Sequence, residues 1–224
     1  MYLSRLFLND HNRQAAQDLR SAYALHQTLR WAYAGAGEVP GPLPDGERLL
    51  WRKDVVKEDD GAQREFIIVQ SQTRPDWLAV ESRSPGYFQF EPDVKPFDLS
   101  GLQAGQQFIF RLRANVTVNR WRDNQNRDEE PRTKREALRG AVEQVAWLER
   151  QGERGGFSLI STDIAQSGNV RLYKARGGAP MTLFAVTFEG LLQVEDPAQL
   201  AQTVQNGIGK AKALGFGLLS LARA

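Results

Sequence analysis

The hydrophobic pattern of the first hundred residues switches between the period typical of strands and the period typical of helices. A strand is predicted from Leu3 to Leu8. A helix follows, and either Asp18 or Ser21 can cap its N-terminus. The apolar positions that give this helix its buried stripe are Ala22, Leu25, Leu29 and Ala32.

The next elements complete a recognisable order. Arg48 to Val56 and Arg64 to Gln72 are β-rich, and the run from Glu58 to Gly61 between them has turn chemistry, so a hairpin is predicted. A short helix is expected to start at Pro75 to Leu78, and a last strand from Tyr87 to Phe90. The order β-α-β-β-α-β is that of a ferredoxin-like module.

A second copy of this order follows a linker marked by Pro92, Pro96 and the stretch from Gly101 to Gly105. A half-buried strand is predicted beyond it, with Arg111 and Arg113 on its polar face. The apolar face of that strand comprises Phe108, Phe110, Leu112, Ala114, Val116 and Val118. A helix is expected from about Lys134 to Gln151, with a helical stripe at Leu138, Ala141, Val142, Val145 and Leu148.

The C-terminal part supplies the remaining elements. Strands are predicted for Phe157 to Ile164 and Met181 to Val194, and a last strand for Leu218 to Leu221. Between them, Asp196 is expected to cap a helix that begins at Pro197 and ends at Gly207. The sequence therefore predicts an α+β protein with two tandem ferredoxin-like (RRM-like) domains, residues 1–95 and 105–224.

Composition narrows the chemistry. The 224 residues include no cysteine, which excludes disulfides, thiolate metal sites and a cysteine nucleophile, and only two histidines. No apolar run approaches the roughly 18 residues of a membrane span, and the N-terminus has no features of a signal peptide, so a cytoplasmic protein is expected. Carboxylate pairs such as Glu129/Glu130 lie in turn-like runs without a nearby histidine, so no metal site is predicted.

Charge is distributed unevenly along the chain. Residues 1–100 carry 12 Lys and Arg against 15 Asp and Glu, whereas residues 101–224 carry 17 against 12. The net charges of −3 and +5 indicate that the second half meets a polyanion, although a solvated surface explains such a difference equally well. Sheets of this kind are a common platform for RNA.

His26 is the main candidate for catalysis. Tyr23, Arg30 and Tyr33 recur around it at helical spacing, on a stripe about a quarter-turn from the buried one. An imidazole can exchange a proton near neutral pH. The alternative is an ordinary, partly exposed helical histidine. His11 lies in an expected loop and is interpreted as a plain surface residue.

A glycine-rich and lysine-containing segment precedes the last strand. Its glycines can let the backbone approach a phosphate and its lysines add charge, but the order of residues is not that of a Walker A loop. The alternative is a tight turn whose glycines permit close packing. The candidate residues here are Gly207, Gly209, Lys210, Lys212, Gly215 and Gly217.

Other basic residues are candidates for RNA contacts. Arg171, Lys174 and Arg176 suggest a basic hairpin that could enter a duplex groove. Arg111 and Arg113 fit contacts to the RNA backbone, or they brace the sheet instead.

Five strings together resemble the CasE-type CRISPR RNA endoribonucleases of the RAMP superfamily, and the likeness spans nearly the whole chain in the right order. The strings begin at Tyr23 (YALHQTL), Phe110 (FRLRAN), Ala146 (AWLER), Phe188 (FEGL) and Gly207, the last being the glycine-lysine segment through GLLSL. The resemblance implies tandem ferredoxin-like domains and a repeat-processing subunit of type I-E Cascade.

The resemblance also implies a reaction and roles for particular residues. The expected activity is metal-independent cleavage of precursor CRISPR RNA at the base of the repeat stem-loop, by attack of a ribose 2′-hydroxyl and without a cofactor. The mature crRNA is expected to stay bound among other Cascade subunits. His26 matches the catalytic histidine, Tyr23 its neighbouring tyrosine, and the segment from Gly207 to Gly217 the signature loop of the family. The family often has a basic residue a little after the histidine; of the two candidate places for it here, Trp31 occupies one and Arg30 the other.

Two rival functions remain open. One is a non-catalytic RNA-binding subunit of a ribonucleoprotein complex with the same double fold. The other is a phosphatase on a ferredoxin-like scaffold, which would act on small acyl or aryl phosphates and ignore RNA.

Overall fold

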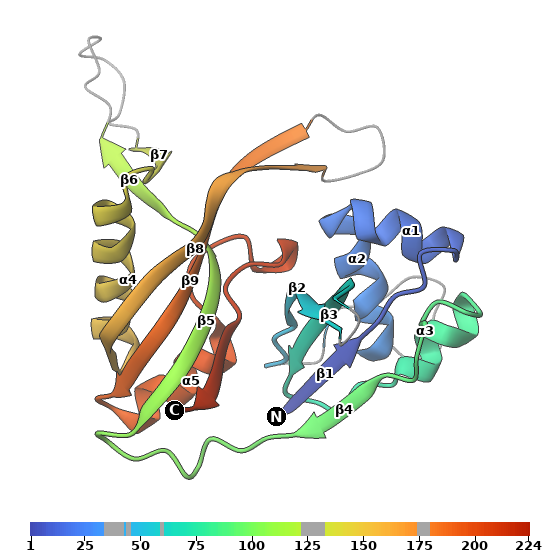
Figure 1. Cartoon of the computed structure of the whole chain (residues 1–224), viewed down its shortest axis with the longest axis horizontal. Helices are drawn as coiled ribbons and strands as arrows, with labels where there is room; N and C mark the ends of the chain where they lie inside the picture. Colours follow the sequence, from blue (N-terminus) through green and yellow to red (C-terminus); the bar gives the residue numbers. More distant parts are fainter. Residues whose placement is uncertain (34–42, 44–45, 59–60, 122–132, 174–179) are drawn as a thin grey trace.

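The computed structural model describes residues 1–33, 43, 46–58, 61–121, 133–173 and 180–224. Two four-stranded antiparallel sheets, each accompanied by helices, lie side by side (Figure 1). The elements of the first half are β1 Tyr2–Leu6, α1 Arg13–Arg20, α2 Ala22–Leu29, η1 Arg30–Tyr33, β2 Leu50–Lys57, β3 Gln63–Ser71, α3 Trp77–Arg83 and β4 Asp93–Pro96. Those of the second half are β5 Gln107–Asn115, β6 Thr117–Trp121, β7 Thr133–Ala137, α4 Ala141–Gly155, β8 Phe157–Tyr173, β9 Pro180–Val194, α5 Pro197–Asn206, η2 Lys212–Leu214 and β10 Leu219–Arg223.

Both sheets have the strand order of the ferredoxin-like fold. The first is ordered β2-β3-β1-β4 and the second β10-β5-β9-β8, so in each the first and third strands of the module lie at the centre. The predicted fold class is therefore confirmed. The predicted hairpin is β2 and β3, which pair from Leu50↔Gln70 to Lys57↔Gln63.

The first half differs from the prediction in two places. The predicted strand Tyr87 to Phe90 is wrong: within this range only Phe88 forms a β-bridge, an isolated one to Leu8. Tyr87 is buried in the core instead, and its hydroxyl donates a hydrogen bond to Asp18 at 2.7 Å. The edge strand is instead β4, on residues that were interpreted as linker; an edge position tolerates its proline, Pro96. Helix α1 was not predicted.

In the second half, the predicted helix starts too early. Residues 133–137 form β7, which pairs with β6, and α4 begins only at Ala141. The predicted stripe is also wrong in part, because Val142 is 85 % exposed whereas Trp147 is buried with Leu148. The predicted α5 is confirmed: Asp196 Oδ1 accepts from the amides of Ala198 and Gln199, and Gly207 is the C-cap.

Each half has its own core, and a third, smaller cluster joins them. This cluster consists of Leu172, Ala185 and Phe216 from the second half, with Ala22 of α2 packed against it. Helix α2 also packs against η2 and β8, and η2 lies between the two sheets (Figure 1). A buried hydrogen bond of 2.7 Å from Gln70 Nε2 to the carbonyl of Val204 adds a second connection.

No helix within the described residues is long and apolar enough to cross a membrane.

Candidate functional site

Helix α2 presents His26 at the edge of its buried face. Ser21 begins the helix, since its hydroxyl accepts a hydrogen bond from the amide of Ala24 at 3.2 Å. Leu25 and Leu29 are each 1 % exposed and face the core, whereas Tyr23 is 39 % exposed. His26 lies between these extremes and is half-buried, as its angular position on the helix predicted.

The imidazole of His26 is neutral at pH 7. Burial lowers its pKa to about 4, and the positive charge of Arg30 acts in the same direction. Its Nδ1 is buried and has no hydrogen-bond partner among the described residues. A neutral imidazole is the form that can accept a proton, so in the resting protein His26 is in the protonation state that a base requires.

The other residues of the predicted stripe divide into two groups. Tyr23 is exposed on the same helix, and the Arg30 guanidinium donates to Gln27 Oε1 at 3.2 Å. Tyr33 is not part of the stripe, because it lies on η1, beyond the end of α2, and its ring packs edge-on against Trp77, with centroids 6.3 Å apart.

The glycines of the segment from Gly207 to Gly217 permit close packing against the first half of the chain. Gly215 has φ +81°, and a Cβ there would lie 2.8 Å from the ring of Trp51. At Gly207, with φ +70°, a Cβ would lie 2.8 Å from the side chain of Leu50. At these two positions the structure supports the packing interpretation, and the segment is tied to β2 rather than projecting from the surface.

Three cations gather where this segment meets the first half. Burial lowers the pKa of Lys212, and the neighbouring charges of Arg48 and Lys210 lower it further. None of the three has a salt bridge among the residues that the structure describes. Because η2, which carries Lys212, packs against α2, this part of the segment adjoins the histidine helix. Sequence reasoning missed Arg48, since only the fold brings it beside Lys212.

The strand arginines lie at the junction between the halves. The Arg111 guanidinium is 3.1 Å from Glu189 and 3.8 Å from Asp54, so it braces the sheet. Arg113 stacks over the ring of Phe216, 5.0 Å from its centroid, and burial lowers its pKa. Their RNA contacts stay a prediction.

The predicted basic hairpin is only partly described. Arg171 is exposed near the end of β8, paired with Thr182 of β9. Lys174 and Arg176 lie outside the described residues.

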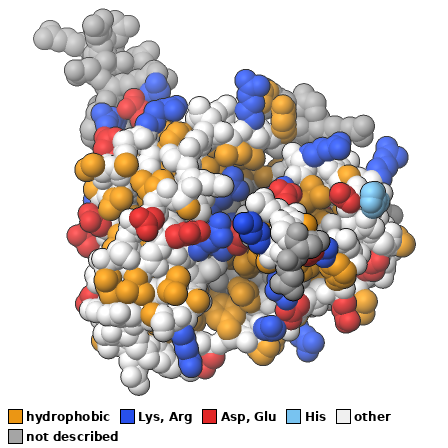
Figure 2. All heavy atoms as spheres, viewed as in Figure 1, with side chains coloured by type: hydrophobic (Ala, Val, Ile, Leu, Met, Phe, Trp, Pro, Cys, Tyr) orange, Lys and Arg blue, Asp and Glu red, His pale blue; other side chains and the backbone are white. Residues whose placement is uncertain are grey.

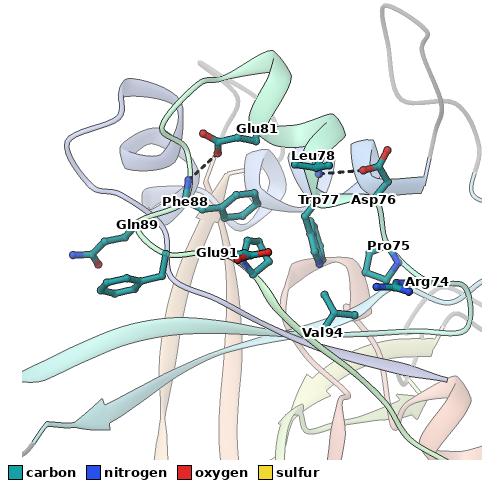
Figure 3. A pocket seen from close by; sticks show the side chains of 12 residues that line it. Arg74, Pro75, Asp76, Trp77, Leu78, Glu81, Phe88, Gln89, Glu91 and Val94 are labelled. Carbon is teal, nitrogen blue, oxygen red and sulfur yellow. Dashed lines mark hydrogen bonds between the residues drawn. The ribbon is translucent and has the colours of Figure 1, made fainter.

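Two other features lie apart from this site. His11 is a surface residue, as predicted, with a side chain 94 % exposed. A groove of about 900 Å³ lies beside α3, lined by Trp77 and Phe88 among others, and its lining includes no predicted site residue (Figure 3). No cluster of three or more His, Asp and Glu that could hold a metal occurs in the described ranges.

The surface agrees with this picture of the site. Figure 2 shows Lys and Arg side chains gathered in the middle of one face, in the hollow between the two halves. Acidic side chains are more widely scattered over the same view. A polyanion is therefore best accommodated between the halves.

Comparisons with known proteins match nearly the whole chain to one group of proteins. The sequence profile described as "CRISPR associated protein" matches residues 1–223. The CRISPR-associated endoribonuclease Cse3 of Thermus thermophilus is 37 % identical over 99 % of this chain and 100 % of its own length. A solved structure of CRISPR endoribonuclease Cse3 bound to a 19 nt RNA superposes with a TM-score of 0.78 at 37 % identity, covering 99 % of this chain and 100 % of that one. The CRISPR system Cascade subunit CasE of Escherichia coli is 39 % identical over 54 % of this chain and 60 % of its own.

Proposed function

The chain belongs to the family of CRISPR-associated proteins that includes the Cse3 and CasE endoribonucleases, and we propose that it cleaves precursor CRISPR RNA and keeps the product bound as a Cascade subunit. The observation that carries the proposal is the half-buried, neutral imidazole of His26, on a helix that packs against a segment whose cations have no salt bridge among the described residues. Relatives named as endoribonucleases and as a Cascade subunit support the substrate and the assembly.

The reaction uses a nucleophile that the substrate brings. The ribose 2′-hydroxyl attacks the adjacent phosphate and loses its proton to His26. As the bond between phosphorus and the 5′-oxygen breaks, His26 passes that proton to the 5′-oxygen. The products are a 2′,3′-cyclic phosphate and a 5′-hydroxyl. Tyr23, exposed on the same helix, orients the attacking or leaving oxygen. The reaction so written requires no metal ion.

The cations bind the phosphates of the repeat. Lys212, Lys210 and Arg48 are available to the scissile phosphate and its neighbours, because they lack salt bridges within the described part of the chain. Arg113 and Arg171 of the second half contact the RNA backbone or groove further along. An anion bound beside His26 raises the pKa of the imidazole, which favours the proton transfer.

The test is cleavage of a repeat hairpin in excess EDTA. We expect the unmodified protein to cut, and His26→Ala to cut about 10²- to 10⁴-fold more slowly while still binding the hairpin. A 2′-deoxyribose at the scissile position should abolish cutting. Tight binding without cutting by the unmodified protein would contradict the proposal and favour the non-catalytic RNA-binding subunit.

A further inference from the structure

Arg52 is a buried arginine at the junction between the two halves. It lies on β2 and is 2 % exposed. Asp54, two residues further along the same face of the strand, accepts from Nε at 2.8 Å and from Nη2 at 2.7 Å. A buried guanidinium is tolerated only when its donors are satisfied, and this fork uses one edge of it.

The remaining nitrogen of Arg52 reaches into the second half. Nη1 donates to the carbonyl oxygens of Arg111 at 3.1 Å and Leu218 at 3.2 Å. Leu218 directly follows Gly217, the last glycine of the glycine-rich segment, whose own amide donates to the carbonyl of Arg113 at 2.7 Å. Arg52 therefore ties β2 to the end of this segment.

The two residues before Arg52 hold other parts of the same segment. Leu50 packs where a Cβ on Gly207 would lie, and Trp51 packs where one on Gly215 would lie. Three consecutive residues of one strand thus contact the start of the segment at Gly207, its last turn at Gly215 and the residue directly after it, Leu218. On its other side, η2 packs against the histidine helix α2.

We propose that Arg52, oriented by Asp54, is a positioning residue that fixes the glycine-rich segment, and the RNA held on the second half, against His26. The inference rests on the proposed function. The base is in the first half, whereas Lys210, Lys212 and Arg113 are in the second. The distance between the base and these cations depends on the junction between the two halves. A looser junction should therefore slow cleavage while leaving the affinity for RNA unchanged.

The decisive variant is Arg52→Lys, which keeps the charge but loses the planar fork that bonds Asp54 and two carbonyls together. Under single-turnover conditions with saturating protein, we expect cleavage slower by about 10²-fold, the scale of a misplacement of about 1 Å. The dissociation constant for a 2′-deoxy hairpin should not change. Lys53→Gln is the matched control: Lys53 is the next residue of β2, forms a salt bridge of 2.7 Å with Glu65, and should leave both quantities unchanged.

A distance measurement separates this inference from the proposed function. The chain has no cysteine, so Leu78→Cys and Val142→Cys give one label site in each half, on side chains 76 % and 85 % exposed. We expect a narrow distribution of label distances in the doubly labelled parent and a broader one after Arg52→Lys.

Three outcomes decide the question. If Arg52→Lys cleaves at the parental rate, the inference is overturned. It is also overturned if the variant is slower only because a smaller fraction of it is folded, and the label distances of the folded protein match those of the parent. A parent protein that does not cut refutes the proposed function. In that case the label distances alone still decide whether Arg52 fixes the junction.

Discussion

His26 has a titration behaviour that follows from its place on the helix. On the buried face with Leu25 and Leu29 it would be sealed from solvent, and on the exposed face with Tyr23 it would keep an ordinary histidine pKa. At the edge it is desolvated enough for its pKa to fall to about 4, and its Nδ1 has no partner among the described residues. The imidazole is therefore unprotonated at neutral pH, in the form that can accept a proton.

Activity should therefore persist into mildly acidic solution. Because the imidazole stays unprotonated in the free protein until the pH approaches 4, we expect kcat/KM for hairpin cleavage to be level from pH 8 to pH 5 and to fall below that. The measurement is a pH series of kcat/KM under subsaturating hairpin. A fall centred near 6.5 would mean that the imidazole is solvated in the free protein.

Stability should follow the same residue. The folded protein resists protonating His26, whereas the unfolded chain takes up that proton near pH 6.5. The free energy of unfolding should therefore decrease as the pH falls from 6.5 to 4, by at most about 3 kcal/mol, and show no contribution from His26 above pH 7.

His26→Asn isolates that contribution. The variant keeps a polar side chain but removes the titration, so its unfolding free energy should depend less on pH between 4 and 6.5. Asp18, whose pKa is raised by burial, contributes with the opposite sign in both proteins, and the difference between them cancels it. Denaturant titrations at several pH values measure the difference.

At the scale of elements, the glycine-rich segment is shaped by the strand beneath it. Gly215 combines a left-handed backbone with a 2.8 Å approach to Trp51, and both requirements exclude a side chain. Gly105 offers a control, because its φ of +83° is nearly the same but nothing lies within 4 Å of its Cβ position.

We expect Gly105→Ala to destabilise the protein by about 1 kcal/mol, the cost of the left-handed conformation alone. Gly215→Ala should cost about 1–3 kcal/mol more, since Trp51 must move. Thermal or denaturant unfolding of the two variants tests this. Equal effects would show that the segment adapts without disturbing β2.

At the scale of the whole molecule, the fold concentrates positive charge at one place. The fold gathers cations from both halves, Arg48 from the first and Lys210 and Lys212 from the second, around one segment. Affinity for RNA should therefore depend on salt through these contacts.

We expect the logarithm of the hairpin association constant to fall linearly with the logarithm of salt concentration. Lys212→Gln should reduce the slope by about 1, as the loss of one phosphate contact does. Binding titrations at several salt concentrations measure it, with Lys53→Gln as the control that should leave the slope unchanged. A parental slope for Lys212→Gln would place that lysine away from the RNA.

The sequence by itself determined the β-α-β-β-α-β order of each half and several of the periodic faces. The alternation from Phe110 to Val116, the cap at Asp196 and the helical stripe of Leu25 and Leu29 are local patterns, and local patterns specify local structure. The angular position of His26 followed for the same reason. The resemblance to a family, carried by strings that include Tyr23 and His26, supplied the function.

Only the tertiary structure decided how the two halves meet. Arg52 and Asp54 look like a charged pair on an edge strand, and nothing local indicates that Leu218, 166 residues away, accepts a hydrogen bond from that arginine. Likewise, Tyr87 was predicted to lie in a strand, whereas in the structure its hydroxyl is buried and bonds to Asp18. Val142 was predicted to be buried, whereas in the helix that begins at Ala141 it is exposed. Contacts between segments far apart in the sequence depend on packing that no local pattern encodes.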